Sequence, residues 1–148
     1  MKRSLLYMVV LAVILVLPTK ATDVGKLRPV QSVAVYHEND GYIILTDTKD
    51  VGRGETISAA VENLKATTPA TIYLDTAQYL MVEEEELIDQ LRPYLRKTVK
   101  LYRFVGEPPM EEVSKFLSAH GDGPTVRSWK KTDVLPVVDC RGERLVIL

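Results

Sequence analysis

The chain has 148 residues, of which 46% are hydrophobic and 26% are charged, and its formal net charge is −1. The length and composition suit one compact globular domain. This charge balance excludes the strongly basic composition of most nucleic-acid-binding domains, and the single cysteine, Cys140, excludes a disulfide within the chain.

The first 21 residues have the pattern of an export signal. Lys2 and Arg3 precede an uninterrupted apolar stretch, Leu5 to Leu17, and small residues follow up to Ala21. The stretch is shorter than the roughly 20 residues that span a bilayer comfortably. We expect cleavage after Ala21 and an exported, extracytoplasmic protein, with retention as an uncleaved membrane anchor as the alternative. Cleavage would also remove Lys20 and change the formal charge from −1 to −4, because three basic residues are lost.

Residues 22–29 are polar, contain Gly25 and Pro29, and predict a linker between the membrane and one α/β domain over residues 30–148. A strand is expected from Val30 to Tyr36 and a return strand from Tyr42 to Leu45. The turn between them contains Asp40-Gly41, which accepts the positive φ angles of tight hairpins. Thr46 to Glu55 then predicts a charged, glycine-bearing loop.

The following segment predicts a helix that returns into a strand. Thr56 or Ser58 offers a hydroxyl to cap the helix. Four apolar residues at helical spacing define its buried face, and Pro69 stops it. These four residues are Ile57, Ala60, Val61 and Leu64. An apolar extended run continues from Ile72 to Val82, with a break near Asp75 and Thr76.

The rest of the chain alternates helices and strands. Glu83 to Glu86 predicts an acidic first turn of a second helix. Its apolar stripe runs to Leu95, and Pro93 should kink or end it. The remaining predicted elements are a strand at Val99–Val105, a helix at Met110–Leu117, extended runs at Val126–Trp129, Val134–Val138 and Leu145–Leu148, and a turn at Arg141-Gly142. This order predicts an α/β (α+β) fold, with a mixed sheet that opens and closes with β-hairpins and about three helices.

No catalytic or metal-binding cluster is evident. His37 and His120 have no second ligand at helical or hairpin spacing, so no metal and no cofactor are expected. Cys140 lies at the mouth of a predicted turn without a nearby histidine, which favours a packing cysteine. The Gly52 to Thr56 segment before a helix suggests anion binding only weakly, since it lacks the Gly-Lys-Thr ending of a nucleotide loop.

The most charged loops are the candidates for binding. Loops on a rigid scaffold commonly carry recognition, which points to Arg53 and Glu55 in the polar loop and to Glu84 and Glu85 in the acidic run. The alternative from a different class is a small hydrolase, in which Asp75 would act with Glu55 or Asp47.

Two parts of the sequence, with the order of elements around them, resemble the N-terminal domain of the C-subunit lipoproteins of bacterial spore-germination receptors. They are Glu55-Thr56-Ile57-Ser58-Ala59-Ala60 and Thr68 to Tyr73 with the strand through Val82. The resemblance covers roughly residues 30–117. Those lipoproteins carry a lipidated cysteine after the signal, which this chain lacks near Ala21, and they are much longer.

The resemblance implies an extracytoplasmic, membrane-associated and non-enzymatic accessory module, in a setting of sporulation or germination. The expected partner is a membrane protein, with no nucleic acid and no metal. A third possibility is a structural domain that assembles with a membrane partner through the exposed edge of its sheet.

Overall fold

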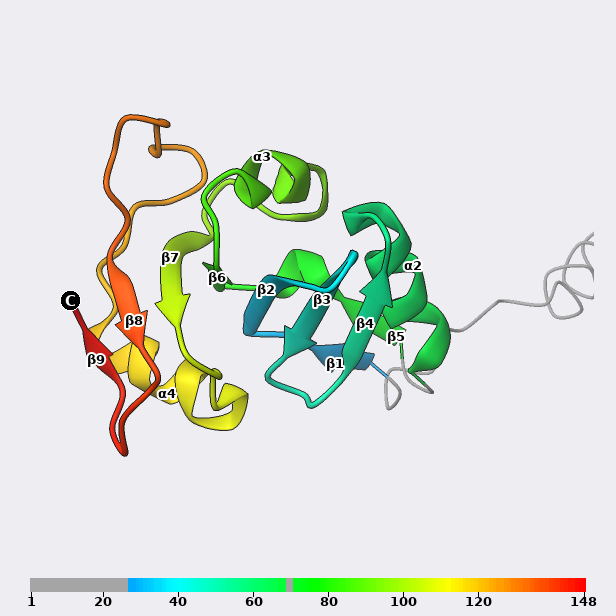
Figure 1. Ribbon diagram of the computed structural model, residues 1–148, viewed down its shortest axis with the longest axis horizontal. Coiled ribbons are helices and arrows are strands. Elements are labelled where there is room, and N and C mark those ends of the chain that lie inside the picture. Colours follow the sequence, from blue (N-terminus) through cyan, green and yellow to red (C-terminus); the bar gives the residue numbers. More distant parts are fainter. Residues whose placement is uncertain (1–26, 69–70) are drawn as a thin grey trace, which may run out of the picture.

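The computed structural model describes residues 27–68 and 71–148 (Figure 1). The predicted export signal and most of the predicted linker lie outside these residues. Within the described part of the chain, no helix is long and apolar enough to cross a membrane.

A seven-stranded mixed sheet forms the centre of the molecule, with the strand order β4-β3-β2-β6-β7-β8-β9. Four neighbouring strands run parallel: β2 (Ser32–Glu38), β6 (Tyr79–Val82), β7 (Lys100–Val105) and β8 (Val137–Asp139). Antiparallel strands flank them: β3 (Gly41–Thr46) and β4 (Val51–Gly54) beside β2, and β9 (Val146–Ile147) beside β8. The predicted mixed sheet with hairpins near both ends is therefore confirmed.

The helices lie on both faces of this sheet. The helices α2 (Ile57–Thr67) and α3 (Leu87–Leu91) bury their apolar residues in one core, whereas α4 (Met110–His120) contributes to a second core on the opposite face. After α4 the chain returns to the first face, where Val126, Trp129 and Leu135 join the core of α2 and α3. Figure 1 shows this returning segment beside α3 and away from α4.

The central helix forms as predicted, but the loop before it does not. The Thr56 side chain accepts a hydrogen bond from the N–H of Ala59, and the four predicted residues of the apolar face are buried. The predicted loop from Thr46 to Glu55 contains β4, which pairs with β3. Gly52 and Gly54 hold β4 against α2, since a Cβ atom at either position would lie 2.4 Å from the backbone of Ala60. These glycines permit close packing, which explains the Gly-x-Gly pattern without an anion.

The extended run from Ile72 to Val82 is divided between two sheets. β5 (Thr71–Tyr73) pairs in parallel with β1 (Leu27–Pro29) in a separate two-stranded sheet, so the last three residues of the predicted linker form a strand. A 3₁₀ turn, η2 (Leu74–Thr76), then makes the predicted break before β6. The hydroxyl of Thr76 accepts the N–H of Val30 at 3.0 Å and ties this break to the start of β2.

Further boundaries differ from the predictions. Glu83 to Glu86 forms bends and turns before α3 and is not the first helical turn. α3 ends at Leu91, and Pro93 lies in the 3₁₀ turn η3 (Arg92–Tyr94), in agreement with the predicted stop. In the hairpin between β2 and β3, Asn39 takes the positive φ of 54°, while Gly41 stands where a Cβ would approach Gly54 O to 2.9 Å.

The C-terminal part has less strand than predicted. Val126 to Ser128 forms a turn, in which the N–H of Trp129 donates to the carbonyl of Thr125. The predicted strand over Val134–Val138 begins only at Val137; Pro136 has no N–H to donate, although its carbonyl accepts the N–H of Arg103 at 2.9 Å. The last predicted strand is reduced to Val146–Ile147.

A small hydrogen-bond network at the amino end of β2 connects this strand, the turn after β3 and α4. The carboxylate of Asp47 accepts hydrogen bonds from the Gln31 N–H at 3.1 Å and from the Ser114 hydroxyl at 3.0 Å. The Ser114 hydroxyl lies 2.6 Å from that of Ser32, and both serines are buried. The network therefore fixes α4 against β2 and the turn after β3, which is a structural role for Asp47.

Candidate functional site

The connections after β6 and β7 leave the sheet towards opposite faces. Beyond β6 the chain passes through Glu83 to α3 on the first face, and beyond β7 it passes through Gly106 to α4 on the second. Diverging connections open a crevice outside the carboxyl ends of parallel strands, which is where open α/β sheets place their ligands. This edge is therefore the first place to look for a site.

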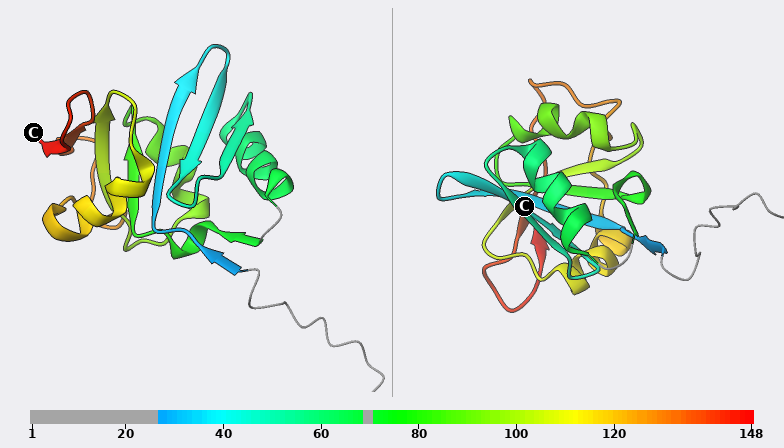
Figure 2. Two further views of the ribbon diagram at one scale, coloured as in Figure 1. Left: turned by 90° about the horizontal axis from the view of Figure 1, so that it is seen from below. Right: turned by 90° about the vertical axis from the view of Figure 1, so that its right-hand side faces the viewer.

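A pocket of about 350 Å³ lies at this edge. Its lining comes from the ends of β2 and β7 and from the segments after β6 and β7: Tyr36, Glu38, Glu83, Phe104, Gly106, Glu107 and Pro108. We call it the strand-end pocket. The rings of Tyr36 and Phe104 meet edge to face, with centroids 6.2 Å apart and an interplanar angle of 81°. The β2–β3 hairpin projects past the neighbouring strands beside it (Figure 2).

The strand-end pocket is acidic. Glu83 is partly committed, since its Oε2 accepts the backbone N–H of His37 at 3.2 Å. Neither Glu38 nor Glu107 forms an ion pair or a side-chain hydrogen bond within the described residues. Burial raises the pKa of Tyr36 and the negative charge of Glu38 raises it further, whereas the positive charge of Arg53 lowers it. The ring stays neutral beside two carboxylates that form no ion pair in the described residues.

Two arginines at this edge have other partners, whereas Arg53 lies close enough for its positive charge to act on Tyr36. Arg141 lies against Gly106 and binds Asp139 in a bidentate pair, with N–O distances of 2.9 and 2.7 Å. This pair lowers the pKa of Asp139 to about 2. The Nε of Arg103 donates to the backbone carbonyl of Glu83 at 3.4 Å. These contacts engage Arg141 and Arg103, while Arg53 lines a neighbouring hollow together with Glu38 and would compete there with an external cation.

The structure separates the residues that the sequence singled out. Arg53 and Glu55 lie beside the turn of the β2–β3 hairpin and line a hollow of about 420 Å³ with Glu38, Tyr42 and other hairpin residues. Glu84 is exposed, and Glu85 is half-buried and lines a different pocket. The four residues thus form two separate groups.

The carboxylates of the alternative hydrolase do not come together as a set. Gly54 pairs with Tyr42, which pairs with His37 near the carboxyl end of β2, so Glu55 lies at that end. Asp75 lies in η2, near the amino end of the same strand, and faces Arg96 at 3.9 Å. The two ends are separated by roughly 20 Å at 3.3 Å per strand residue. Glu55 is therefore beyond reach of a substrate held at Asp75, whereas Asp47 lies at the amino end and accepts hydrogen bonds from the Ser114 hydroxyl and the Gln31 N–H.

The histidines and the cysteine considered in the sequence analysis pack against neighbouring side chains. In the described residues, no group of three or more His, Cys, Asp and Glu side chains is placed to hold a metal ion. Cys140 packs against the second core, and burial raises the pKa of its thiol to about 11. His37 and His120 contact the rings of Tyr42 and Phe116 respectively.

The sequence analysis missed the residues of the strand-end pocket. A usable signal was present, since Glu38, Glu83 and Glu107 each follow an apolar strand by one or two residues. Their convergence depends on β2, β6 and β7 being parallel neighbours, and the strand pattern alone does not establish this order.

Comparisons of the chain with protein-family models, with curated proteins and with solved structures found no match. The evidence for function is therefore the geometry of the described residues and the pattern of the sequence.

Proposed function

We propose that the protein is an exported, membrane-associated binding or accessory module without catalytic activity, and that it holds a positively charged segment of a membrane partner in the strand-end pocket. The observation that carries the proposal is that one pocket holds two aromatic rings and two carboxylates, Glu38 and Glu107, which form no ion pair in the described residues. The extracytoplasmic setting rests on the export pattern before Ala21. The resemblance to spore-germination receptor subunits supports a role in sporulation or germination.

The chemistry of the pocket favours a cation. An ammonium or guanidinium group is attracted to carboxylates and to the faces of aromatic rings. The apolar faces of Tyr36 and Phe104 suit the methylene stem of a lysine or arginine side chain. A volume of about 350 Å³ lies at the lower end of the range for ligand sites, so one or two side chains would fill it.

The test is partner recovery from native membranes with the full chain carrying a C-terminal affinity tag. The site variant is Glu38→Gln with Glu107→Gln. The matched control is Glu62→Gln with Glu112→Gln, which removes the same charge from exposed positions on α2 and α4. Both double variants should fold, since surface substitutions usually change stability within about 0.5 kcal/mol. Recovery should fall only in the site variant, and raised salt should weaken capture by the wild type.

Other outcomes point to other functions. Equal recovery by wild type and site variant would reject the strand-end pocket. In that case, loss on replacing Arg53 and Glu55 would favour the hollow beside the hairpin turn. The sheet edge would be the next candidate, because Val146 on β9 is 49% exposed and Leu148 beside it is 70% exposed. No partner at all, together with hydrolysis of a cell-wall or peptide substrate, would overturn the proposal in favour of an enzyme.

A further inference from the structure

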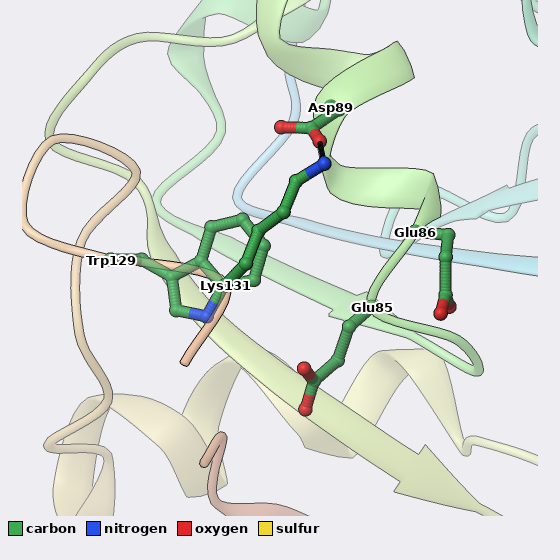
Figure 3. A pocket seen from close by; sticks show the side chains of 5 residues that line it. All are labelled: Glu85, Glu86, Asp89, Trp129 and Lys131. Atoms are coloured by element: carbon green, nitrogen blue, oxygen red, sulfur yellow. Dashed lines mark ion pairs between the residues drawn. The ribbon is translucent and has the colours of Figure 1, made fainter. Parts of the chain in front are cut away.

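A second pocket lies between the Glu83–Glu86 turn, α3 and the loop that carries Trp129 (Figure 3). Its volume is about 250 Å³, and its lining residues are Glu85, Glu86, Asp89, Trp129 and Lys131. We call it the tryptophan pocket. It shares no lining residue with the strand-end pocket.

Trp129 carries a hydrogen-bond donor without an acceptor. The residue is only 5% exposed, and its Nε1 is the one buried side-chain polar atom within the described residues that has no hydrogen-bond partner. Leaving a buried donor unpaired is costly, and such groups are rare in native proteins. Arg92 lies over the ring at 5.6 Å from its centroid, so the face of the indole is occupied while its N–H is not.

The charges around the tryptophan pocket are only partly balanced. Asp89 binds Lys131 at 2.8 Å and Arg92 at 3.1 Å, and these contacts lower its pKa. Glu85 and Glu86 form no ion pair in the described part of the chain. The pocket thus presents two carboxylates that lack a cation and one N–H that lacks an acceptor.

Lys131 lines the tryptophan pocket together with Trp129. In the view of Figure 3 its side chain passes in front of the ring to reach Asp89, and Glu85 and Glu86 lie across the pocket from it. The Lys131 side chain is 78% exposed, and the ion pair with Asp89 holds its end. Exposed ion pairs contribute little to stability, so a ligand would displace Lys131 at little cost.

We propose that the tryptophan pocket binds one lysine or arginine side chain of a peptide segment. The cation would lie between Glu85 and Glu86, and a backbone carbonyl next to that side chain would accept the N–H of Trp129. A volume of about 250 Å³ is below the usual range for small-molecule sites and suits a single long side chain. This assignment goes beyond the proposed function and does not depend on the strand-end pocket.

Trp129 is the only tryptophan of the chain, so its fluorescence reports on this pocket directly. The experiment titrates the full chain with acetyl-Gly-Arg-Gly-amide, the lysine analogue, and the uncharged norleucine analogue. The two charged peptides should give a saturable change in the millimolar range, and the norleucine peptide none. Glu85→Gln with Glu86→Gln should weaken binding at least tenfold, whereas Glu38→Gln with Glu107→Gln should leave it unchanged. Lys131→Ala should strengthen it, because a competing cation is removed from the pocket.

Three results would overturn the assignment. The first is the absence of a saturable change in both the wild type and Lys131→Ala. The second is equal binding of the norleucine peptide, which would show an apolar cavity only. The third is unchanged affinity in the Glu85→Gln, Glu86→Gln variant. The Trp129→Phe variant keeps an aromatic ring but has no N–H, so its affinity for the charged peptides, measured by nuclear magnetic resonance, should be lower. An unchanged affinity would show that the indole N–H takes no part in binding.

Discussion

Replacing Gly52 or Gly54 by alanine adds only one methyl group, yet it should destabilise the fold strongly. At Gly52 the new Cβ would lie 2.4 Å from Ala60 O and 2.6 Å from Leu64 Cβ. Carbon atoms in favourable contact are about 3.5–4.0 Å apart, so α2 would have to move by about 1 Å. The opposing atoms belong to the helix backbone or lie directly on it, and no side-chain rotation relieves the clash.

The expected loss in the free energy of unfolding is about 1–3 kcal/mol, the usual cost of overpacking a core. An alanine at a compatible position would instead stabilise by about 0.4–1 kcal/mol, through the entropy of the unfolded chain. Gly142→Ala is the matched control, since its Cβ would find no atom closer than 3.9 Å. The double variant Gly52→Ala, Gly54→Ala should cost less than the sum of the single variants, because one shift of α2 relieves both clashes.

Urea denaturation followed by Trp129 fluorescence and by circular dichroism measures these differences. Equal midpoints for Gly52→Ala, Gly142→Ala and the wild type would refute the close packing of β4 on α2. Strict additivity of Gly52→Ala and Gly54→Ala would instead show two independent clashes, and the single helix displacement would be wrong.

Other consequences of the structure can be measured separately. Leu64→Ala should lower the free energy of unfolding by about 2–5 kcal/mol, and an unchanged denaturation midpoint would contradict the buried face of α2. Cys140 has a pKa of about 11 in place of 9.0, so at pH 8 its thiol should be alkylated roughly a hundredfold more slowly in the folded than in the unfolded protein. Because the folded state favours the protonated thiol, the free energy of unfolding should fall as pH rises from about 9 to 11. Equal alkylation rates in the two states would contradict its burial. Mass spectrometry of the native protein should find an N-terminus after Ala21, whereas an intact Met1 in the membrane fraction would show an anchor. Glu85→Gln with Glu86→Gln should leave the stability of the free protein within about 0.5 kcal/mol of wild type, as judged by denaturation.

The sequence predicted the elements whose periodicity is local. The apolar face of α2, its Thr56 cap and the β2–β3 hairpin were predicted correctly, since each depends on residues within about ten positions of one another. Pro93 likewise marked the end of α3. Local pattern is sufficient where the pairing partner is the next element along the chain.

Elements that depend on distant partners were missed. β4 has the sequence Val-Gly-Arg-Gly, which has low strand propensity, yet its glycines fit the surface of α2. β1 exists through pairing with β5, about forty residues later. Val126 to Trp129 has strand-like composition, but Trp129 is used to cover α3 and the core. The candidate pockets were missed for the same reason, because their walls come from segments far apart in the chain.

The Glu83–Glu86 turn connects the two candidate pockets. Adjacent carboxylates repel one another, and α3 has only five residues, so the stabilisation of acidic groups by its dipole is about 0.3–1 kcal/mol at most for exposed side chains. Glu86 at the N-cap position makes no side-chain cap hydrogen bond, and the Glu85 carboxylate forms no ion pair in the described residues. Repulsion opposes the dipole attraction in the free protein, and the fold gains little from these charges. A bound cation would offset the repulsion while the dipole attraction remained. Carboxylates that form no ion pair within the described fold are therefore well placed to contribute to binding.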